Sequence, residues 1–308
     1  MFAICERRFG VELEYNAFDN KSRSRTLNDL PSGIYDLALR LQKASGKTIE
    51  INKWSYTNNN HNWVLKPDSS CGIEICSPPF RGMHGYDEFY RVLSDFVLLK
   101  GIDSDSRCSM YVHVEIEDFS LNNLMFMVEK WINFELFFFM LTNTKRWLNQ
   151  YCIPLGFNKN FDASKPINMI DMMEKLSDYK YYSINLFHYV KNRKKTVEFR
   201  CMGNEACVNP DNAGNWCKLL LCFVDRCKNQ SQFNPIDIKY LNISDAIKFL
   251  DLDNYFQDDS IKFWIISKLN AVLHLEQNES FYFWNSVLDI TRNDIIDTIE
   301  KMEQNLND

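Results

Sequence analysis

The sequence predicts an α+β protein, and three observations support that class. Four short segments alternate apolar and polar residues with the period of two that is typical of strands: residues 10–14, 72–76, 110–116 and 196–202. Between them lie segments whose apolar residues recur every three to four positions, as on one face of a helix. From about residue 230 onward the pattern is helical, so an all-helical C-terminal region is expected.

Turn and cap residues give the order of the elements. Pro31, Ser32 and Gly33 predict the start of a first helix, and Gly46 predicts its end. Further helices are expected over 85–100, over 121–149 as one helix or a broken pair, and over 168–178. Asn209, before a proline, predicts the start of a helix that reaches about residue 227. Additional strands are expected over 48–54, 63–66 and 181–187, the last forming a hairpin with 196–202, and C-terminal helices near 244–251, 259–273 and 285–305.

Composition excludes several classes of protein. The 308 residues are 45% hydrophobic and 25% charged, which is typical of a globular protein with one large domain or two smaller ones. A net charge of −6 argues against a nucleic-acid partner. The chain shows no signal-peptide pattern near its start and no apolar run that would span a bilayer. The ten cysteines have no CxxC spacing, so we expect free thiols in a soluble, cytoplasmic protein without a membrane partner.

The polar faces of the four alternating strands carry a consistent set of side chains. When the apolar residues of each strand share one face, the opposite face presents four carboxylates, a histidine and an arginine: Glu12, Glu14, Glu74, His113, Glu198 and Arg200. Carboxylates suit Mg²⁺ or Mn²⁺ holding a polyphosphate, and an arginine beside them suits a transferring phosphoryl group. A chain without a glycine-rich phosphate loop would hold phosphate through such metals. The alternative is a set of solvated strand faces with surface ion pairs.

Five motifs, in this order, resemble the putative amidoligase family of glutamine synthetase-like carboxylate–amine ligases. They are GVELE at 10–14, WVLKPDSS at 63–70, GIEICSPP at 72–79, YVHV at 111–114 and TVEFR at 196–200. The resemblance extends over roughly residues 8–225. It implies a catalytic domain over 1–228, with 229–308 as a helical subdomain or lid. It also implies a curved antiparallel sheet that forms a funnel, with helices behind it.

The resemblance further implies ATP-dependent amide or isopeptide formation through an acyl phosphate, with ATP and Mg²⁺ or Mn²⁺ as cofactors. The substrates would be carboxylates and amines on small molecules, peptides or proteins. Assembly into a homo-oligomer is compatible with this reading. By position, the metal ligands would be Glu12, Glu14, Glu74 and Glu198. Arg200 would neutralise phosphate, with His113 and Glu198 also at the nucleotide. Asp68 would face the metal or the amine, and the candidates for substrate contacts are Arg146, Arg81 and Asn185.

One position departs from the family pattern. The family often has His-x-His where this chain has Tyr111-Val112-His113, and a neutral phenol is a poor ligand for a divalent cation. Two alternatives therefore stay open. One is a module of the same fold that binds a nucleotide or metabolite without turnover. The other is an interaction protein whose C-terminal helices, with the aromatic run at 281–284, contact a partner.

Overall fold

The computed structural model describes most of the chain. The described residues are 6–16, 33–52, 61–98, 103–142, 146, 149–155, 179–191, 194–229, 243–256, 259–274 and 282–307, with the backbone alone for 282–291 and 307. The fold is α+β, with an open, mostly antiparallel sheet and helices that include the C-terminal region. The fold class predicted from the sequence is therefore confirmed at this level.

The sheet is built around its first strand. β1 (Arg8–Asn16) pairs antiparallel with β4 (Gly72–Cys76) on one side and with β6 (Met110–Glu115) on the other. The strand order is β2-β3-β4-β1-β6-β8-β7, and the two-residue strand β5 (Phe80–Arg81) also pairs with β1. The remaining strands are β2 (Ile49–Ile51), β3 (Trp63–Asp68), β7 (Ile184–Asn185) and β8 (Thr196–Phe199). Only β2 and β3 pair in parallel among the described strands.

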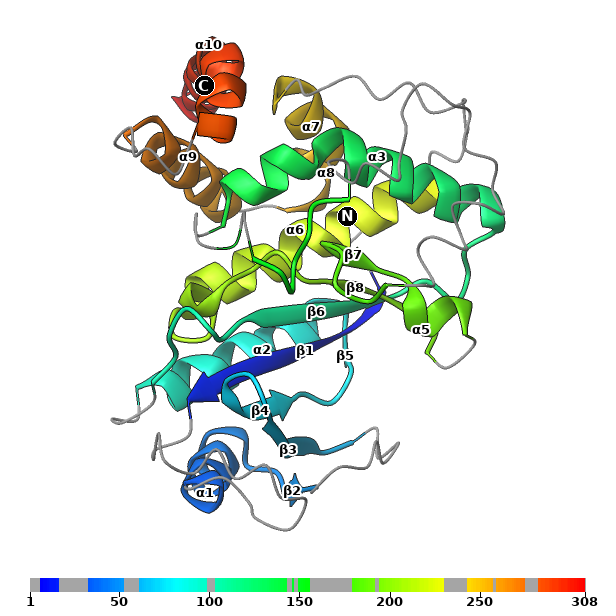
Figure 1. Cartoon of the computed structure of the whole chain (residues 1–308), viewed down its shortest axis with the longest axis vertical. Coiled ribbons are helices and arrows are strands. Elements are labelled where there is room, and N and C mark those ends of the chain that lie inside the picture. The colour runs from blue at the N-terminus through cyan, green and yellow to red at the C-terminus, as the bar shows by residue number, and fades with distance from the viewer. Residues whose placement is uncertain are drawn as a thin grey trace.

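Helices cover the apolar face of the sheet. α2 (Gly82–Val97) and α6 (Pro210–Asn229) contact each other, α6 contacts β6, and α3 (Leu121–Met140) packs on α6 (Figure 1). α1 (Ile34–Ser45) packs on α2 beside β2. A cluster of aromatic side chains fills the core between α3, α6 and β8, and Trp131 stacks on Phe138 with 4.3 Å between ring centroids. This packing leaves the opposite face of the sheet for polar residues.

The C-terminal helices lie on the helical side of the molecule. α7 (Ile243–Leu250) and α9 (Ser260–Leu273) contact both α3 and α6, and α10 (Tyr282–Asn307) packs on α7 and α9. Figure 1 shows these helices beyond α3 and α6 from the sheet. The short helices α5 (Phe187–Val190), α8 (Leu252–Tyr255) and the 3-10 turn η2 (Asn204–Ala206) complete the described elements. Among the described residues, no helix has both the length and the apolar composition needed to cross a bilayer.

Most predicted elements are confirmed, with shifted ends. α1 starts directly after Gly33 and is capped by Gly46, and Asn209 caps α6 by accepting a hydrogen bond from the amide of Asn212. The segment 121–149 is shorter than predicted, because α3 ends at Met140. The predicted 181–202 hairpin does pair antiparallel, but its strands are short and α5 lies between them. The predicted helix at 168–178 lies outside the described residues.

The state of the cysteines agrees with the free thiols expected from the sequence. The nine cysteines in the described part of the chain are all free, and all but Cys76 are buried. A buried free thiol behaves as a small apolar side chain, so most of these residues serve packing. Two of them, Cys71 and Cys76, lie instead among the acidic side chains of the sheet.

Candidate active site

The carboxylates gather on one face of the sheet because of strand periodicity. Along β1, Phe9, Val11 and Leu13 point into the core, so Glu12 and Glu14 point to the other face. Neighbouring strands bring their own polar residues into register with this pair. The opposed pairs are Glu14 with Glu74, Glu12 with Tyr111, His113 with Glu198, and Glu198 with Asn185. The polar face is therefore a single continuous site across β3, β4, β1, β6, β8 and β7.

Glu12, His113 and Glu198 form the first group. The Nε2 atom of His113 lies 3.0 Å from Oε1 of Glu12, and one ligand atom from each of the three residues falls within 4.8 Å of the others. Burial alone would raise the pKa of Glu12, but the charge of His113 and its hydrogen bond hold that pKa well below its ordinary value. Two carboxylates and an imidazole at this spacing can ligate a divalent cation.

Glu198 is held between two donors. Asn185 donates its amide Nδ2 to Oε2 of Glu198 at 2.8 Å, and the Arg200 guanidinium donates to Oε1. Arg200 also donates from Nε to the carbonyl oxygen of Tyr151 at 3.1 Å. Burial alone would lower the pKa of Arg200, but the charge of Glu198 raises it above its ordinary value, so the guanidinium stays charged. A fixed guanidinium beside the first group is suited to an anionic ligand.

Tyr111, opposite Glu12 in the sheet, packs its ring against this arginine. The guanidinium carbon of Arg200 lies 4.0 Å from the centroid of the Tyr111 ring. Burial, and then the charge of Glu14, raise the pKa of the Tyr111 phenol above its ordinary value, so the phenol is neutral. Tyr111 therefore supplies an aromatic surface to the guanidinium.

Glu14, Asp68 and Cys71 form a second group, with ligand atoms within 4.8 Å of one another. Glu14 is 3% exposed, and burial followed by the charges of Asp68 and Glu74 raises its pKa to about 9. Asp68 accepts hydrogen bonds from the amides of Ser70 and Cys71 at 2.7 and 3.1 Å. Burial alone would raise the pKa of Asp68, but a hydrogen bond from the Ser70 hydroxyl, together with those from the amides, holds it below its ordinary value. The group thus pairs an ionised carboxylate with a protonated one.

Glu12, Glu74 and Cys76 form the third group. Lys66 Nζ lies 2.6 Å from Oε1 of Glu74, and the Cys76 thiol donates to the same oxygen at 3.0 Å. Burial, and then the charge of Glu12, raise the pKa of Glu74 to about 7, against the opposing charge of Lys66. Glu12 therefore belongs to two groups and connects them.

Of the two arginines predicted to contact substrate, Arg146 lies beside the site and Arg81 lies away from it. Arg146 is 2% exposed and donates from Nη2 to the Arg200 carbonyl oxygen at 2.6 Å, and its charge partly opposes the rise in the pKa of Glu14. It lies beside the site. Arg81 is on β5 at the far end of β1, where it contacts the carbonyl of Glu6 at 3.1 Å. Its side chain is 63% exposed and does not join the groups above.

Sequence reasoning missed four residues of the site. Lys66, Cys71, Cys76 and Lys194 all contact the predicted carboxylates, Lys194 through Glu12 at 3.8 Å. The period-two rule could have predicted Lys66, since it lies on the same face of β3 as Asp68. The same rule also places Cys76 on the face of β4 that carries Glu74, whereas Cys71, in the turn before β4, gave no such signal.

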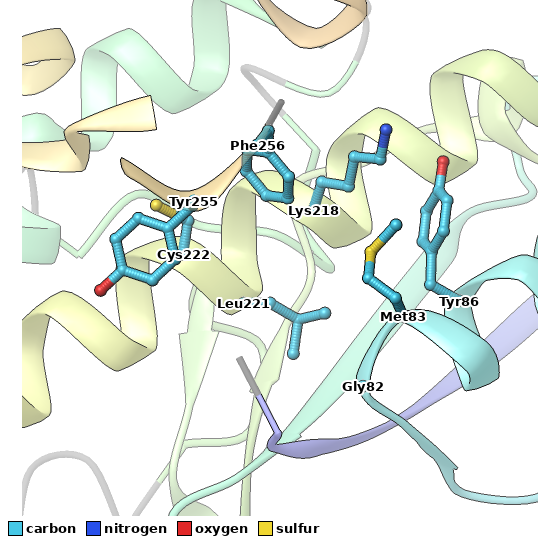
Figure 2. A pocket seen from close by; sticks show the side chains of 8 residues that line it. All are labelled: Gly82, Met83, Tyr86, Lys218, Leu221, Cys222, Tyr255 and Phe256. Atoms are coloured by element: carbon cyan, nitrogen blue, oxygen red, sulfur yellow. The ribbon is translucent and has the colours of Figure 1, made fainter. Parts of the chain in front are cut away.

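A separate groove lies on the helical side, between α2, α6 and α8 (Figure 2). The side chain of Lys218 crosses it, with its ammonium 4.9 Å from the Tyr86 ring centroid and 5.6 Å from that of Phe256. The other lining residues are Gly82, Met83, Leu221, Cys222 and Tyr255. This groove contains none of the predicted site residues, so the carboxylate face and not this groove is the candidate active site.

Comparison with known proteins identifies the family of this chain. The model of a family described as "Putative amidoligase enzyme" matches residues 5–224, which is more than half of the chain. The match includes every residue of the three groups. No curated protein matches the chain.

Proposed function

Because the chain belongs to the putative amidoligase family, whose name indicates a ligase-type enzyme, we propose that it is an ATP- and Mg²⁺-dependent carboxylate–amine ligase. The observation that carries this proposal is the convergence of Glu12, His113 and Glu198 beside the buried guanidinium of Arg200. Phosphoryl transfer needs this combination of a cation site and a fixed positive charge.

The donor set fits the proposed cation. Glu12 and Glu198 offer carboxylate oxygens and His113 offers an imidazole nitrogen, while Glu74 and Glu14 extend the acidic face along β4 and β1. Mg²⁺ is commonly held by a few carboxylates together with nucleotide phosphates, and Mn²⁺ also accepts imidazole. When bound, the cation would neutralise the phosphate oxygens of ATP. A cation held by Glu12 would also lie near the Glu12–Glu74–Cys76 group.

The reaction would run in two steps. In the first, an oxygen of the substrate carboxylate attacks the γ-phosphorus of ATP, and ADP leaves. Arg200 would stabilise the charge on the transferring phosphoryl group, with Glu198 fixing its orientation. In the second step the amine attacks the acyl carbon, inorganic phosphate leaves, and the amine loses a proton. The acyl phosphate must be kept from water during this step.

Three other residues have supporting roles in the proposal. Asp68 is ionised and would face a metal or the incoming amine. Arg146, beside Glu14 and Arg200, is the better placed of the two arginines for a substrate carboxylate, since Arg81 lies at the other end of β1. Asn185 would act through Glu198, to which it donates, and not through the substrate.

The proposal extends to the larger architecture. We assign the catalytic domain to residues 1–228, with the polar sheet face as the wall of a funnel resembling that of glutamine synthetase. Residues 229–308 would form a helical subdomain, in keeping with the packing of α7 and α9 on α3 and α6. A cytoplasmic location, small-molecule, peptide or protein substrates, and the absence of nucleic-acid and membrane partners belong to the same proposal.

The alternative is a module of this fold that binds a nucleotide without turnover. Two observations favour it: Tyr111 stands in place of a family imidazole, and the Arg200 guanidinium already contacts Glu198 and Tyr151. Formation of ADP that Glu198→Gln abolishes would exclude this alternative.

Turnover and binding experiments test the proposal together. Purified protein with ATP, Mg²⁺ and pooled carboxylates and amines should release ADP and phosphate. Glu12→Gln should abolish this release and weaken the binding of a non-hydrolysable ATP analogue with Mg²⁺ in calorimetry. Glu115→Gln is a matched control, since Glu115 lies on β6 two residues beyond His113 but contacts Arg8. The absence of nucleotide turnover, together with unchanged binding by Glu12→Gln, would refute the proposal.

A further inference from the structure

The turn between β3 and β4 brings a thiol into the acidic face. Asp68 ends β3 and Cys71 precedes β4, so the tight turn places both side chains beside Glu14 on the adjacent strand β1. One carboxylate oxygen from Glu14, one from Asp68 and the Cys71 sulfur all lie within 4.8 Å of each other. This spacing allows three ligands to reach one cation.

One atom of this group lacks a protein partner. Glu14 is 3% exposed, and within the described residues its Oε2 atom has no hydrogen-bond partner. A buried polar atom is normally satisfied, because removing it from water without a partner costs free energy. A cation bound between the three side chains would supply that partner.

The other two ligands are fixed in place. The amides of Ser70 and Cys71 hold Asp68 at 2.7 and 3.1 Å, and the Cys71 thiol donates to the same Asp68 oxygen at 3.4 Å. The thiol of Cys108, next to β6, lies close enough to that of Cys71 for each to shift the pKa of the other. Sulfur is therefore concentrated at this end of the site, whereas the group of Glu12, His113 and Glu198 offers only oxygen and nitrogen.

We propose that Glu14, Asp68 and Cys71 form a second cation position that selects a thiophilic divalent ion of the Zn²⁺ class over Mg²⁺. Thiolate and carboxylate ligands together suit Zn²⁺, whereas Mg²⁺ prefers oxygen ligands alone. Binding is a proton exchange without any redox change: the ion replaces the thiol proton of Cys71 and any proton on Glu14, and both protons pass to solvent. The inference deepens the proposed function, because it separates this position from the one that would hold Mg²⁺ and ATP.

Cobalt reports directly on such a site. The full chain, reduced and freed of metal with a chelator, is titrated anaerobically with Co²⁺ while its near-ultraviolet absorbance is recorded. We expect a thiolate-to-cobalt charge-transfer band that Zn²⁺ abolishes and that a large excess of Mg²⁺ leaves unchanged. Cys71→Ala should lose the band, and Glu14→Gln should weaken Co²⁺ binding by about tenfold or more.

Cys76→Ala is the matched control, since Cys76 lies at the other end of β4 in the group of Glu12 and Glu74. It should keep the band. A band that survives Cys71→Ala, or that disappears with Cys76→Ala, would overturn the proposal. Circular dichroism verifies that each variant folds, and Cys71→Ser repeats the test if Cys71→Ala does not fold.

The two proposals fail separately. Glu12→Gln should abolish turnover and keep the cobalt band, because Glu12 is not a ligand of this position. ATP turnover without a cobalt band would refute the second cation position alone. A cobalt band that follows Cys71, in a protein without turnover, would refute the ligase proposal alone.

Discussion

The Arg200 guanidinium stacks on the Tyr111 ring, with 4.0 Å between the guanidinium carbon and the ring centroid. The two residues come from β6 and from the end of β8, and the contact fixes the arginine whose other donors reach Glu198 and Tyr151. Tyr111 thus has a physical role of its own. It orients the charge that we assign to phosphoryl transfer.

This contact predicts a difference between two substitutions of Tyr111. Tyr111→Phe retains the ring and should leave kcat nearly unchanged. Tyr111→Leu removes a cation–π contact that contributes roughly 0.5–2 kcal/mol, so kcat should fall by roughly 2- to 30-fold. Combining Tyr111→Leu with Arg200→Lys should cost less than the sum of the two single effects. Full additivity in this double-mutant cycle would show that Tyr111 does not act through Arg200.

The raised pKa of Glu14 predicts that Glu14→Gln stabilises the protein increasingly as pH rises. Below pH 4.5 both folded and unfolded states are protonated at Glu14, so the carboxyl has no pH-dependent effect there. Between pH 4.5 and about 9 the unfolded state ionises first, and wild-type stability falls relative to the variant. Urea unfolding in chelator should show the gap widening by roughly 1–3 kcal/mol between pH 5 and pH 8. A gap that does not change with pH would contradict the assignment.

Cation binding should release protons at neutral pH. The pKa values of Glu14 and Glu74 are raised to about 9 and about 7, and a carboxylate must ionise to ligate a cation. Affinity for divalent cations should therefore decrease as pH falls from 9 towards 6. Calorimetry in two buffers of different ionisation enthalpy measures the release, and equal heats in both buffers would argue against it. Glu14→Gln should reduce the number of protons released.

Removal of Lys66 should destabilise the fold in a pH-dependent way. Lys66 pairs with Glu74 at 2.6 Å in a largely buried position, and Lys66→Met leaves that carboxylate without its cation. The expected loss is about 2–4 kcal/mol at pH 8 and less at pH 5, where Glu74 is protonated in the variant and its burial costs little. Lys66→Met/Glu74→Gln should recover part of the loss. Equal losses at both pH values would instead indicate that the lysine stem acts by packing.

Much of the fold could be predicted because periodicity and cap residues are local signals. The alternation that predicts β1 and the glycine that ends α1 each involve only a few neighbouring residues. Pairing is not local: the parallel contact of β2 with β3 and the interruption of the 181–202 hairpin by α5 depend on distant packing. The helix predicted over 168–178 lies outside the described part.

The same distinction applies to the site. The period-two rule was sufficient to place Glu12, Glu14, Glu74 and Glu198 on one face, and the structure brings them to the same side of the sheet from β1, β4 and β8. The register between strands determines which other residues lie at the site. Cys71 meets Glu14 only because Asn16 of β1 opposes Gly72 of β4, and Arg81 is separated from the site because it opposes Arg8. Neither relation is visible in one segment of sequence.

Glu12 belongs to two of the three cation-capable groups within the described residues, and this sharing has a thermodynamic consequence. A carboxylate that serves two positions cannot give each its full charge, so ions at those positions would influence each other's binding through that single side chain. If Glu12 bridged them, one oxygen to each, the first ion would order the ligand that the second requires while repelling it by charge. The occupancies of the two positions would then be linked variables, and no titration could treat them as independent sites.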